Sequence, residues 1–585
     1  METKSSVFLA FQGGGAKGVV HAGALLAVNE LGLDIKGVSG TSAGSMIAAL
    51  IAAGYNGVDL VDPINESHLF ETITPKFGIH RATDIFSESA WTWLKRARQM
   101  PAALSAIQKK ISKLKSLPLL GHLLGKPGAA LAASVFLLII VAYPLAAQIV
   151  TVVSIAAWLG AYFLAKRLSR GVSSVVAIRR LIDGAIAHKM GLSKQNVTFR
   201  DLADAGGIPL KIVATNVSGE CLELFCNDRT PDTPIADAVA ASVCLPIIFI
   251  PWRFHFRRIT ETMEFQTAGT FFDGGLMSNL PAWPFDEERL LFPEATTIAL
   301  GIGATEPKSQ EDNAKHWLSS IINAIVSGTG EIHTRAVGKI IKIPLKCELT
   351  LLEFDAPISK IYEEVIRSRD QVKRQLRQEL TVYPRLMKEA TNTLQAAITA
   401  ILKMYEGRWY SEPLANQTIR VALATQRSGA MNTLSLVYSA GYTHYHPDSR
   451  LTLPLSGSFA GAAWKEGSIV ATAPFSNDIN MHAKDKIWEK IQWVMCIPVY
   501  PPSMKLIVPV EGDSAKPPMI GKTGNEIAKT RPFVIVIDGT MPFDDSLENA
   551  AEELVECLER IEQSAVKYLQ DKKLDQILQG SNSWL

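Results

Sequence analysis

Two consecutive strand–turn–helix units open the chain and restrict the folds available to it. The first unit runs from an apolar stretch at residues 5–11, through the glycine-rich sequence GGGAKG, into a helix at about 19–31. The second follows at once as DIKGVSG, the turn TSAG and the apolar run SMIAALIAAG. Short buried strands that enter helices through tight turns are typical of α/β proteins. The sequence therefore predicts an α/β fold.

The chain of 585 residues is too long for a single hydrophobic core, and about two to four domains are expected. Apolar residues make up 47% of it and charged residues 20%, which excludes a disordered protein. Helical periodicity dominates 313–340 and 358–406, and the pattern from about 415 is rich in strands. We therefore predict a first domain at 1–355, a helical linker at 356–410 and a second domain at 411–585.

Several protein classes are excluded by simple counts. The six cysteines form no CxxC pair, so neither a disulfide framework nor a zinc site is expected, and a reducing compartment is. The net charge of +2 identifies no partner, and no nucleic-acid ligand is expected. The first residues, METKSSVFLAFQGGG, lack the architecture of a signal peptide.

A serine with flanking glycines follows the second predicted strand. Gly40, Ser42 and Gly44 form GxSxG between a strand and a helix. A nucleophilic serine needs such a sharp turn, and the glycines relieve the crowding that the turn creates. The helix that follows directs the positive end of its dipole to the same point. The alternative is a glycine-rich turn in which the serine merely caps the helix.

The opening glycine loop admits three interpretations. As a dinucleotide-binding loop it lacks an acidic residue at the end of the next strand, since Asp34 precedes that strand. As a phosphate-binding P-loop it lacks the GK[ST] sequence, because Gly18 follows Lys17. As an oxyanion hole it fits, because consecutive glycines leave backbone amides free to converge on a developing negative charge. A plain tight turn remains an alternative.

A third motif, Asp273-Gly274-Gly275, follows a predicted strand. An aspartate beside two glycines is accessible enough to serve as a general base, and it is also a common turn sequence. The three motifs together, in this order, resemble the patatin-like phospholipases, which carry G-G-G-x-[KR]-G, G-x-S-x-G and D-G-[AG]. The resemblance covers roughly residues 1–90 and 180–305, and AASVCLPIIF at 240–249 extends it.

This resemblance implies a three-layer α/β/α fold and a Ser–Asp dyad that works without histidine, metal or cofactor. Ser42 would be the nucleophile and Asp273 the base. The amides around Gly14 and Gly15 would form the oxyanion hole, and Lys17 would add positive charge. Gly13 and Gly18 complete the loop, Gly40 and Gly44 the nucleophile elbow, and Gly274 and Gly275 the base loop. A histidine triad that uses His316 or His333 is the alternative.

A long insertion at about 90–180 separates the serine from the aspartate. Residues 89–182 contain no Asp or Glu, and residues 127–165 carry no charge at all. If both catalytic groups lie on one side of a membrane, the chain crosses it an even number of times. Two short spans at 127–165 reach the lower limit of length, and the basic flanks put both ends on the cytoplasmic side. A buried helical pair or an oligomer contact is the alternative.

An amphipathic helix is predicted at 102–117, where apolar residues recur at helical spacing against lysines. Such a helix suits an anionic membrane surface.

The last third of the chain, 415–565, resembles a GAF domain. GSFAGAAWKEGSIVAT, WVMCIPVY and the segment from PFVIVIDG onward carry this resemblance, and Asp538 and Phe543 fit its D-x-x-x-x-F element. The family implies either a small-molecule ligand or a dimerisation module, so a homo-oligomer is expected.

Together these features predict a membrane-associated lipid acyl hydrolase of the phospholipase A type, located on the cytoplasmic face and regulated by its C-terminal domain. Its substrate would be a membrane phospholipid. Acyl transfer or thioester hydrolysis by the same dyad is an alternative, and so is a non-catalytic membrane sensor or scaffold.

Overall fold

The computed structural model describes most of the chain in two compact units. The first unit comprises residues 1–337 and 343–373, and the second comprises 338–342 and 374–585. Within them the structure describes residues 5–96, 152, 154–155, 158–159, 170–303, 337, 339–407, 418–426, 432–443, 446–471, 491–499, 533–540 and 551–571.

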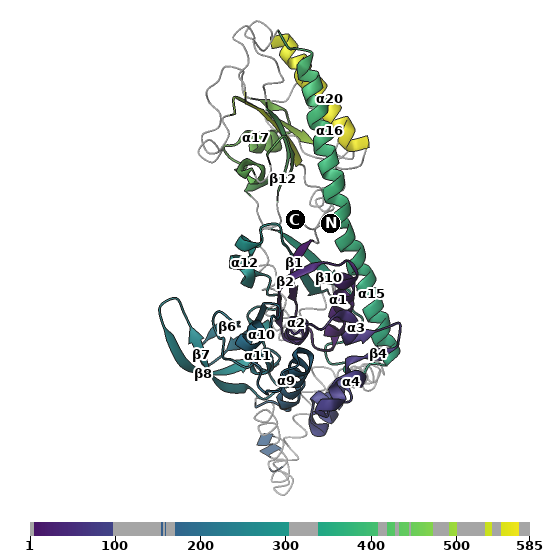
Figure 1. The fold of residues 1–585 in the computed structure, drawn as a ribbon, viewed down its shortest axis with the longest axis vertical. Helices are drawn as coiled ribbons and strands as arrows, with labels where there is room; N and C mark the ends of the chain where they lie inside the picture. The colour runs from purple at the N-terminus through teal and green to yellow at the C-terminus, as the bar shows by residue number, and fades with distance from the viewer. Residues whose placement is uncertain are drawn as a thin grey trace, which may run out of the picture. The chain divides into compact units, whose positions relative to one another are not determined.

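The described strands of the first unit form an eight-stranded mixed sheet (Figure 1) in the order β10-β9-β1-β2-β5-β8-β7, with β6 paired to β5. Strands β9, β1, β2 and β5 are parallel neighbours, whereas β6, β8 and β7 join antiparallel. The bounds are β1 (Ser6–Phe11), β2 (Asp34–Thr41), β5 (Leu210–Asn216), β6 (Cys221–Phe225), β7 (Trp252–Ile259), β8 (Glu264–Phe272), β9 (Thr296–Ile302) and β10 (Ile340–Leu345).

The register of this sheet brings the three sequence motifs together. Phe11 at the end of β1 is paired with Gly40 near the end of β2, so the glycine loop and the GxSxG turn leave neighbouring parallel strands at the same edge. Thr41 pairs with Val213 of β5, and Thr215 pairs with Phe272 at the end of β8. Asp273 therefore follows a strand that ends beside the same edge.

Helices cover this sheet. α2 (Ala43–Ala52) packs on β1, β2 and β5, while α11 (Ile235–Ser242) contacts both β5 and α9 (Val176–Met190). α1 (Val20–Glu30) lies against α15 (Ile358–Arg377), and the Ser368 hydroxyl donates a hydrogen bond of 2.7 Å to the Val20 carbonyl. The shorter helices are α3 (Gly57–Leu60), α4 (Leu69–Thr72), α10 (Phe199–Asp204) and α12 (Asp286–Leu291), and a two-stranded ribbon joins β3 (Val61–Asp62) to β4 (Ser67–His68).

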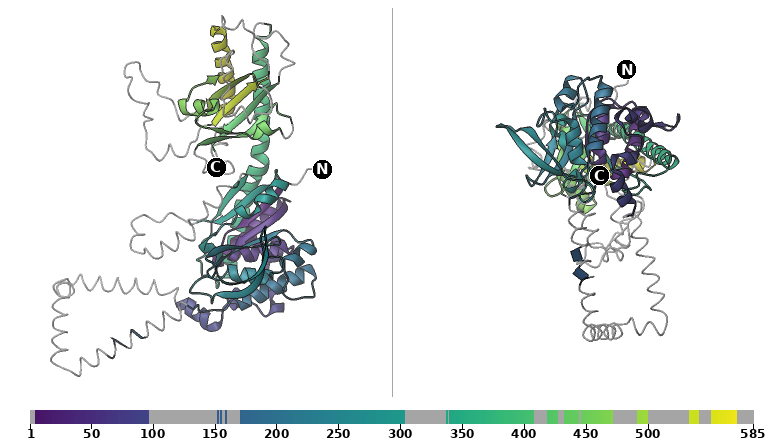
Figure 2. Two further views of the ribbon diagram at one scale, coloured as in Figure 1. Left: turned by 90° about the vertical axis from the view of Figure 1, so that its left-hand side faces the viewer. Right: turned by 90° about the horizontal axis from the view of Figure 1, so that it is seen from below.

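The predicted α/β architecture is confirmed for this unit, and the first two strand–turn–helix units lie where the sequence indicates. Two strands were not anticipated. The first is β7, in the β7–β8 hairpin that projects from the body of the first unit (Figures 1 and 2), where Phe254 and Phe256 lie between Arg253 and Arg257. The second is β10, which begins at Ile340, where the helix predicted at 313–340 was expected to end. The rest of that expected helix, 313–336, lies outside the described residues.

The helix predicted at 358–406 is present. It consists of α15, a π-helical turn at Gln378–Val382 and α16 (Tyr383–Lys403). A proline at the second position of α16 has no backbone N–H to give to the helical ladder, and such losses favour a local change of helical pitch.

The described strands of the second unit form a six-stranded antiparallel sheet in the order β13-β12-β11-β16-β15-β14. Alternate residues of its central strands face opposite cores, as expected for strands buried on both faces. Val421 and Ile535 belong to the core shared with α16 and α20, whereas Ala422 and Val534 belong to the other, which includes Ala460 of α17. The bounds are β11 (Ile419–Thr425), β12 (Thr433–Ala440), β13 (Thr452–Pro454), β14 (Val470–Ala471), β15 (Trp493–Val499), β16 (Phe533–Gly539), α17 (Phe459–Glu466) and α20 (Ala551–Asp571).

The structure does not test the two predicted membrane elements. The amphipathic helix at 102–117 and, except for five scattered positions, the apolar hairpin at 127–165 lie outside the described residues. Across the described ranges, none of the helices has the length and apolar character that a bilayer span requires.

Candidate active site

Ser42 occupies a sharp turn between β2 and α2. Its backbone adopts φ 53° and ψ −128°, a conformation that is uncommon for any residue except glycine. The flanking glycines are required by close backbone approach. A Cβ on Gly40 would collide with the Gly44 carbonyl, and one on Gly44 would collide with the Phe11 carbonyl. The GxSxG spacing is therefore a steric requirement of this turn.

Two buried hydroxyls hold the Ser42 backbone in this conformation. The Ser42 amide donates to Ser242 Oγ at 2.9 Å, and Ser242 Oγ donates in turn to the Val213 carbonyl of β5 at 2.6 Å. Ser45 Oγ donates to the Ser42 carbonyl at 2.6 Å. Ser242 lies 200 positions from Ser42 and carries no motif, so its role in supporting the turn was not predicted.

Asp273 is fixed from three directions. Its amide donates to the Cys244 carbonyl at 2.9 Å, and Thr215 Oγ1 donates to its carbonyl at 2.9 Å. The Gly275 amide donates to Asp273 Oδ1 at 2.7 Å. Gly274 is required here because a Cβ would collide with the Val213 carbonyl.

The carboxyl of Asp273 is buried next to Ser42. Burial raises the pKa of Asp273 from 3.8 to about 6, and the nearby Ser42 hydroxyl and the Gly275 amide only partly offset the effect of burial. Asp273 Oδ2 is buried and, among the described groups, has no hydrogen-bond partner within 3.5 Å. An unsatisfied carboxylate oxygen near a hydroxyl suits a proton acceptor.

The glycine loop lies directly against the serine. A Cβ on Gly13 would come within 2.8 Å of Ser42 Cβ and 2.7 Å of the Asn279 side chain. Three amides of this loop are already bonded: Gly13 N–H to the Asn279 carbonyl, Ala16 N–H to the Leu351 carbonyl and Lys17 N–H to the Gly14 carbonyl.

The amides of Gly14 and Gly15 are not among these bonded groups. No acceptor for either exists in the described part of the chain, and Gly15 adopts φ +54°. These are the two amides around which the oxyanion hole was predicted.

The other two predicted loop residues differ in position. Gly18 lies against Ala43, where a Cβ would come within 2.9 Å of that side chain. The Lys17 side chain is close enough to Cys347 for its charge to affect that thiol. Burial raises the pKa of the Cys347 thiol, and the positive charge of Lys17 works against this. Of the described residues, Gly15, Ala16 and Gly18 line the cavity at Ser42, and Lys17 does not.

Two further residues support this loop and were not predicted. The His21 Nε2 lies 2.8 Å from the Gln12 carbonyl, and the Ile302 amide donates to Gln12 Oε1 at 2.7 Å. Burial lowers the pKa of His21 to about 4, with only partial compensation from the Gln12 carbonyl. His21 is therefore neutral at pH 7, and its Nε2–H donates to Gln12.

A cavity of about 540 Å³ opens at Ser42. Its wall is mostly apolar near the serine, with side chains from α2 and α9 that include Met46, Ile47, Leu50, Ile178 and Leu181. Charged and polar residues also line it, among them His80, Arg81, Lys95, Glu353 and Asp355. Cavities of this size and composition accept small-molecule ligands with a long apolar portion.

His316 and His333, the alternative triad members, lie outside the described residues. Among those that the structure does describe, no group of three or more His, Cys, Asp or Glu side chains is placed to hold a metal ion.

The arrangement of a strained serine, a buried aspartate and a glycine loop agrees with the comparisons to known proteins. Residues 9–286 match the model of the family described as patatin-like phospholipase. These residues carry a patatin-like domain. The resemblance seen in the three motifs is thereby confirmed.

Other similarities are more limited. The uncharacterized protein YqhO of Bacillus subtilis (strain 168) is 48% identical over 56 residues, which is 10% of this chain and 19% of YqhO. The chain thus matches about a fifth of the length of this curated relative. The structure of VipD from Legionella pneumophila is 17% identical with a TM-score of 0.29, covering 69% of this chain and 77% of VipD.

The GAF domain of a two-component sensor histidine kinase from Bacillus halodurans is 14% identical with a TM-score of 0.19. It covers 31% of this chain and 95% of that domain.

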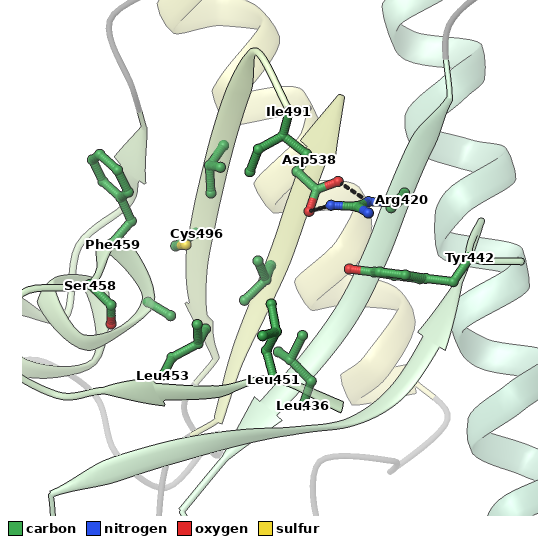
Figure 3. Close-up of a pocket in the computed structure, with 13 residues that line it drawn as sticks. Arg420, Leu436, Tyr442, Leu451, Leu453, Ser458, Phe459, Ile491, Cys496 and Asp538 are labelled. Carbon is green, nitrogen blue, oxygen red and sulfur yellow. Dashed lines mark hydrogen bonds and ion pairs between the residues drawn. The ribbon is translucent and has the colours of Figure 1, made fainter. Parts of the chain in front are cut away.

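The second unit has a cavity of its own, of about 50 Å³ (Figure 3). At one end Arg420, 1% exposed, donates to both carboxylate oxygens of Asp538 at 2.5 and 3.0 Å and to Asp448 at 2.8 Å. Its guanidinium also lies 4.6 Å from the centre of the Tyr442 ring. Burial opposes the charge on Arg420, but Asp538 outweighs burial and raises the pKa of Arg420. Asp538, predicted as a marker of the fold, is thus an ion-pair partner, while Phe543 lies outside the described residues.

Proposed function

We propose that this chain hydrolyses lipid acyl esters with a Ser42–Asp273 dyad. One observation carries the proposal: Ser42, in a strained turn, faces a largely apolar cavity of about 540 Å³ and has a buried carboxyl of raised pKa beside it. Neither helix capping by Ser42 nor turn formation by Asp273 explains why a carboxyl is buried next to this hydroxyl.

The chemistry follows from these positions. The Ser42 hydroxyl attacks the ester carbonyl carbon, and Asp273 accepts the proton. The negative charge that develops on the carbonyl oxygen is stabilised by the amides of Gly14 and Gly15. When the C–O bond breaks, Asp273 returns the proton to the leaving alcohol. Water then attacks the acyl-serine by the same route and releases the fatty acid.

The cavity supports a lipid substrate. Apolar side chains of α2 and α9 would hold an acyl chain next to Ser42, and Lys95 with Arg81 would face a phosphate-bearing head group. A membrane phospholipid, cleaved in the manner of a phospholipase A, fits a cavity lined by both apolar and basic side chains.

Membrane association is part of the proposal and depends on sequence alone. The uncharged residues 127–165 and their basic flanks favour a two-span hairpin with both ends in the cytoplasm. The patatin-like domain would then work on the cytoplasmic leaflet.

We also propose that the second unit regulates the first. The Leu351 carbonyl accepts the Ala16 amide at 2.9 Å and thus holds the glycine loop, and α15 begins seven residues later and leads into the second unit. A small molecule in the Arg420 cavity, or self-association as a homo-oligomer, would act on the loop through this helix.

The test is acyl release by the full chain from phosphatidylglycerol vesicles and from the soluble ester p-nitrophenyl butyrate. Wild type should release acid from both substrates, and Ser42→Ala and Asp273→Asn should each lose at least about a thousandfold. Ser89→Ala, at an exposed serine, is the control and should match wild type. Equal rates for Ser42→Ala and wild type would show that the dyad is not catalytic, and the scaffold interpretation would then stand.

Product analysis separates the remaining alternatives. Free fatty acid indicates hydrolysis, whereas transfer of the acyl group to an added alcohol or lysophospholipid indicates acyl transfer. A much faster reaction with acyl-thioesters than with esters would indicate a thioesterase.

A further inference from the structure

Large apolar side chains are exposed at the outer side of the cavity wall. In the loop between α11 and β7, Leu245 and Phe249 line the cavity, whereas Ile247 and Ile250 are each 49% exposed. The same division occurs at the start of α9, where Ile178 lines the cavity and Val176 is 43% exposed. One side of each segment therefore faces the cavity and the other faces outward.

The backbone conformation of Ile247 indicates that the surrounding structure imposes this exposure. Its φ is +74°, a left-handed conformation that is a clear outlier for a β-branched residue. Strain of this kind persists where the surrounding structure imposes it, and it is concentrated at functional sites. Here the strained residue directs an apolar side chain into solvent.

The same loop anchors the segment that returns from the insertion. The amides of Val172 and Ser173 both donate to the Ile248 carbonyl, at 3.0 and 2.8 Å, and the Ile250 amide donates to the Ser173 carbonyl at 2.8 Å. Gly171 is needed at this contact because a Cβ would collide with the Phe249 carbonyl.

The outgoing flank of the insertion reaches the same cavity. Phe86 stacks on Phe249 with ring centres 5.5 Å apart, and Trp91 and Lys95 line the cavity wall. The chain between 96 and 170, with its uncharged stretch at 127–165, thus starts and ends at one rim.

This rim is also basic. Exposed basic residues lie on the segments that form it: Arg170 precedes Gly171, Arg180 is one helical turn after Val176, and Arg253 follows Ile250 by three residues. Lys95 and Arg96, also exposed, end the outgoing flank. Exposed isoleucine and valine on segments that also carry exposed basic side chains match the chemistry of an anionic lipid surface, where apolar groups enter the interface and cations meet the head groups.

We propose that Ile247, Ile250 and Val176, with the five basic residues around them, form a docking rim that lies on an anionic bilayer. The proposal depends on the lipid-hydrolase function, since it explains how a lipid enters the cavity. With the rim in the interface, an acyl chain passes from the leaflet into the cavity toward Ser42 without crossing water.

A fluorophore placed at the rim tests this directly. The full chain carries Ser42→Ala, to prevent hydrolysis, and Cys221→Ser, because Cys221 is the one cysteine of the six that is not buried. An NBD label is attached at Ile250→Cys. The matched control is Leu290→Cys, on an 81% exposed leucine of α12 at the opposite end of the unit (Figure 1).

With vesicles that contain phosphatidylglycerol, the label at position 250 should shift to shorter wavelength and brighten, and the label at 290 should not. Vesicles of phosphatidylcholine alone should give a weaker response because the basic residues then lack anionic partners. If the chain sediments with anionic vesicles but the fluorescence of the label at 250 is unchanged, docking through this rim is wrong. A chain that does not sediment with these vesicles would overturn it as well.

A second pair of variants tests the effect on activity. The double variant Ile247→Asp, Ile250→Asp should hydrolyse vesicle lipid at least about tenfold more slowly, while hydrolysis of p-nitrophenyl butyrate stays at the wild-type rate. Leu290→Asp should leave both rates unchanged. Equal vesicle rates for the double variant and wild type would refute the rim. If wild type cleaves neither substrate, the proposed hydrolase is wrong, and the fluorescence experiment still decides on docking.

Discussion

The buried site of Asp273 favours the protonated form of its carboxyl group. Burial raises its pKa from 3.8 to about 6, yet the proposed reaction needs the ionised form. A base with a pKa slightly below neutral pH is ionised in the cell and still binds a proton well, which is the balance that general-base catalysis requires.

We therefore expect kcat/KM on p-nitrophenyl butyrate to rise with pH, with an apparent pKa of about 6, and to level off above about pH 7. A profile from pH 4.5 to 8.5 measures it. An activity that stays constant down to pH 4.5 would contradict a base with this raised pKa.

The same pKa affects stability. Because the folded-state pKa is higher than 3.8, the native chain retains a proton between about pH 4 and 6 that the unfolded chain has lost. This contribution is complete below pH 3.8 and is lost as the pH rises through 6, a loss of about 3 kcal/mol at pH 7. Asp273→Asn should thus be inactive but more stable than wild type at pH 7, and this advantage should vanish near pH 4. Urea unfolding at both pH values measures the difference.

Ser242 is a positioning residue, and its loss should affect both stability and catalysis. Ser242→Ala removes the acceptor of the buried Ser42 amide, so we expect the free energy of unfolding to fall by about 1–3 kcal/mol. The strained turn should also relax, and kcat should fall by more than about tenfold while KM changes little. Ser218→Ala is the control, since that hydroxyl donates to Asn216 Oδ1 and accepts the Thr270 amide in a more exposed turn. An unchanged kcat would show that the turn holds without Ser242.

At the scale of elements, buried strands with adjoining glycine turns were predictable, because each is encoded within a dozen residues. β1, β2, β5, β6 and β9 are all of this kind. β7 was not predicted because Arg253, Arg257 and Arg258 obscure its alternation; two of these arginines lie against acidic partners from other segments.

The residues of the candidate site also divide into predictable and unpredictable ones. Ser42, Asp273 and the glycine loop are carried by local motifs. Ser242, Asn279 and Gln12 act only through contacts between segments distant in sequence, which a single sequence does not reveal.

The packing of α1 on α15 depends on one glycine. A Cβ on Gly23 would collide with the Val365 carbonyl in the facing helix, so Gly23→Ala should force the helices apart and cost about 1–3 kcal/mol of unfolding free energy. Gly32→Ala adds the same methyl group where nothing lies within 4 Å, although at φ +63°. Thermal unfolding should show a larger loss for Gly23→Ala. The reverse order would mean that the helix contact is loose.

At the scale of the whole molecule, the chain has two units with separate cores, and their stabilities should be separable. Arg420→Met would leave Asp538 and Asp448 buried without their cation, which typically costs about 3–5 kcal/mol. Calorimetry should show two transitions in wild type, with only one shifted downward in the variant. Arg385→Met, at an arginine 79% exposed, should shift neither. A shift of both transitions would show that the units unfold together.

The strained backbone of Ser42 has a consequence for the stability of the fold. At φ 53° a glycine would be more comfortable than a serine, just as an asparagine would be more comfortable than the buried carboxylate of Asp273. Ser42→Gly and Asp273→Asn would therefore each be expected to raise the stability of the fold while removing the chemistry. The stability of the fold thus explains neither residue, and the proposed reaction explains both.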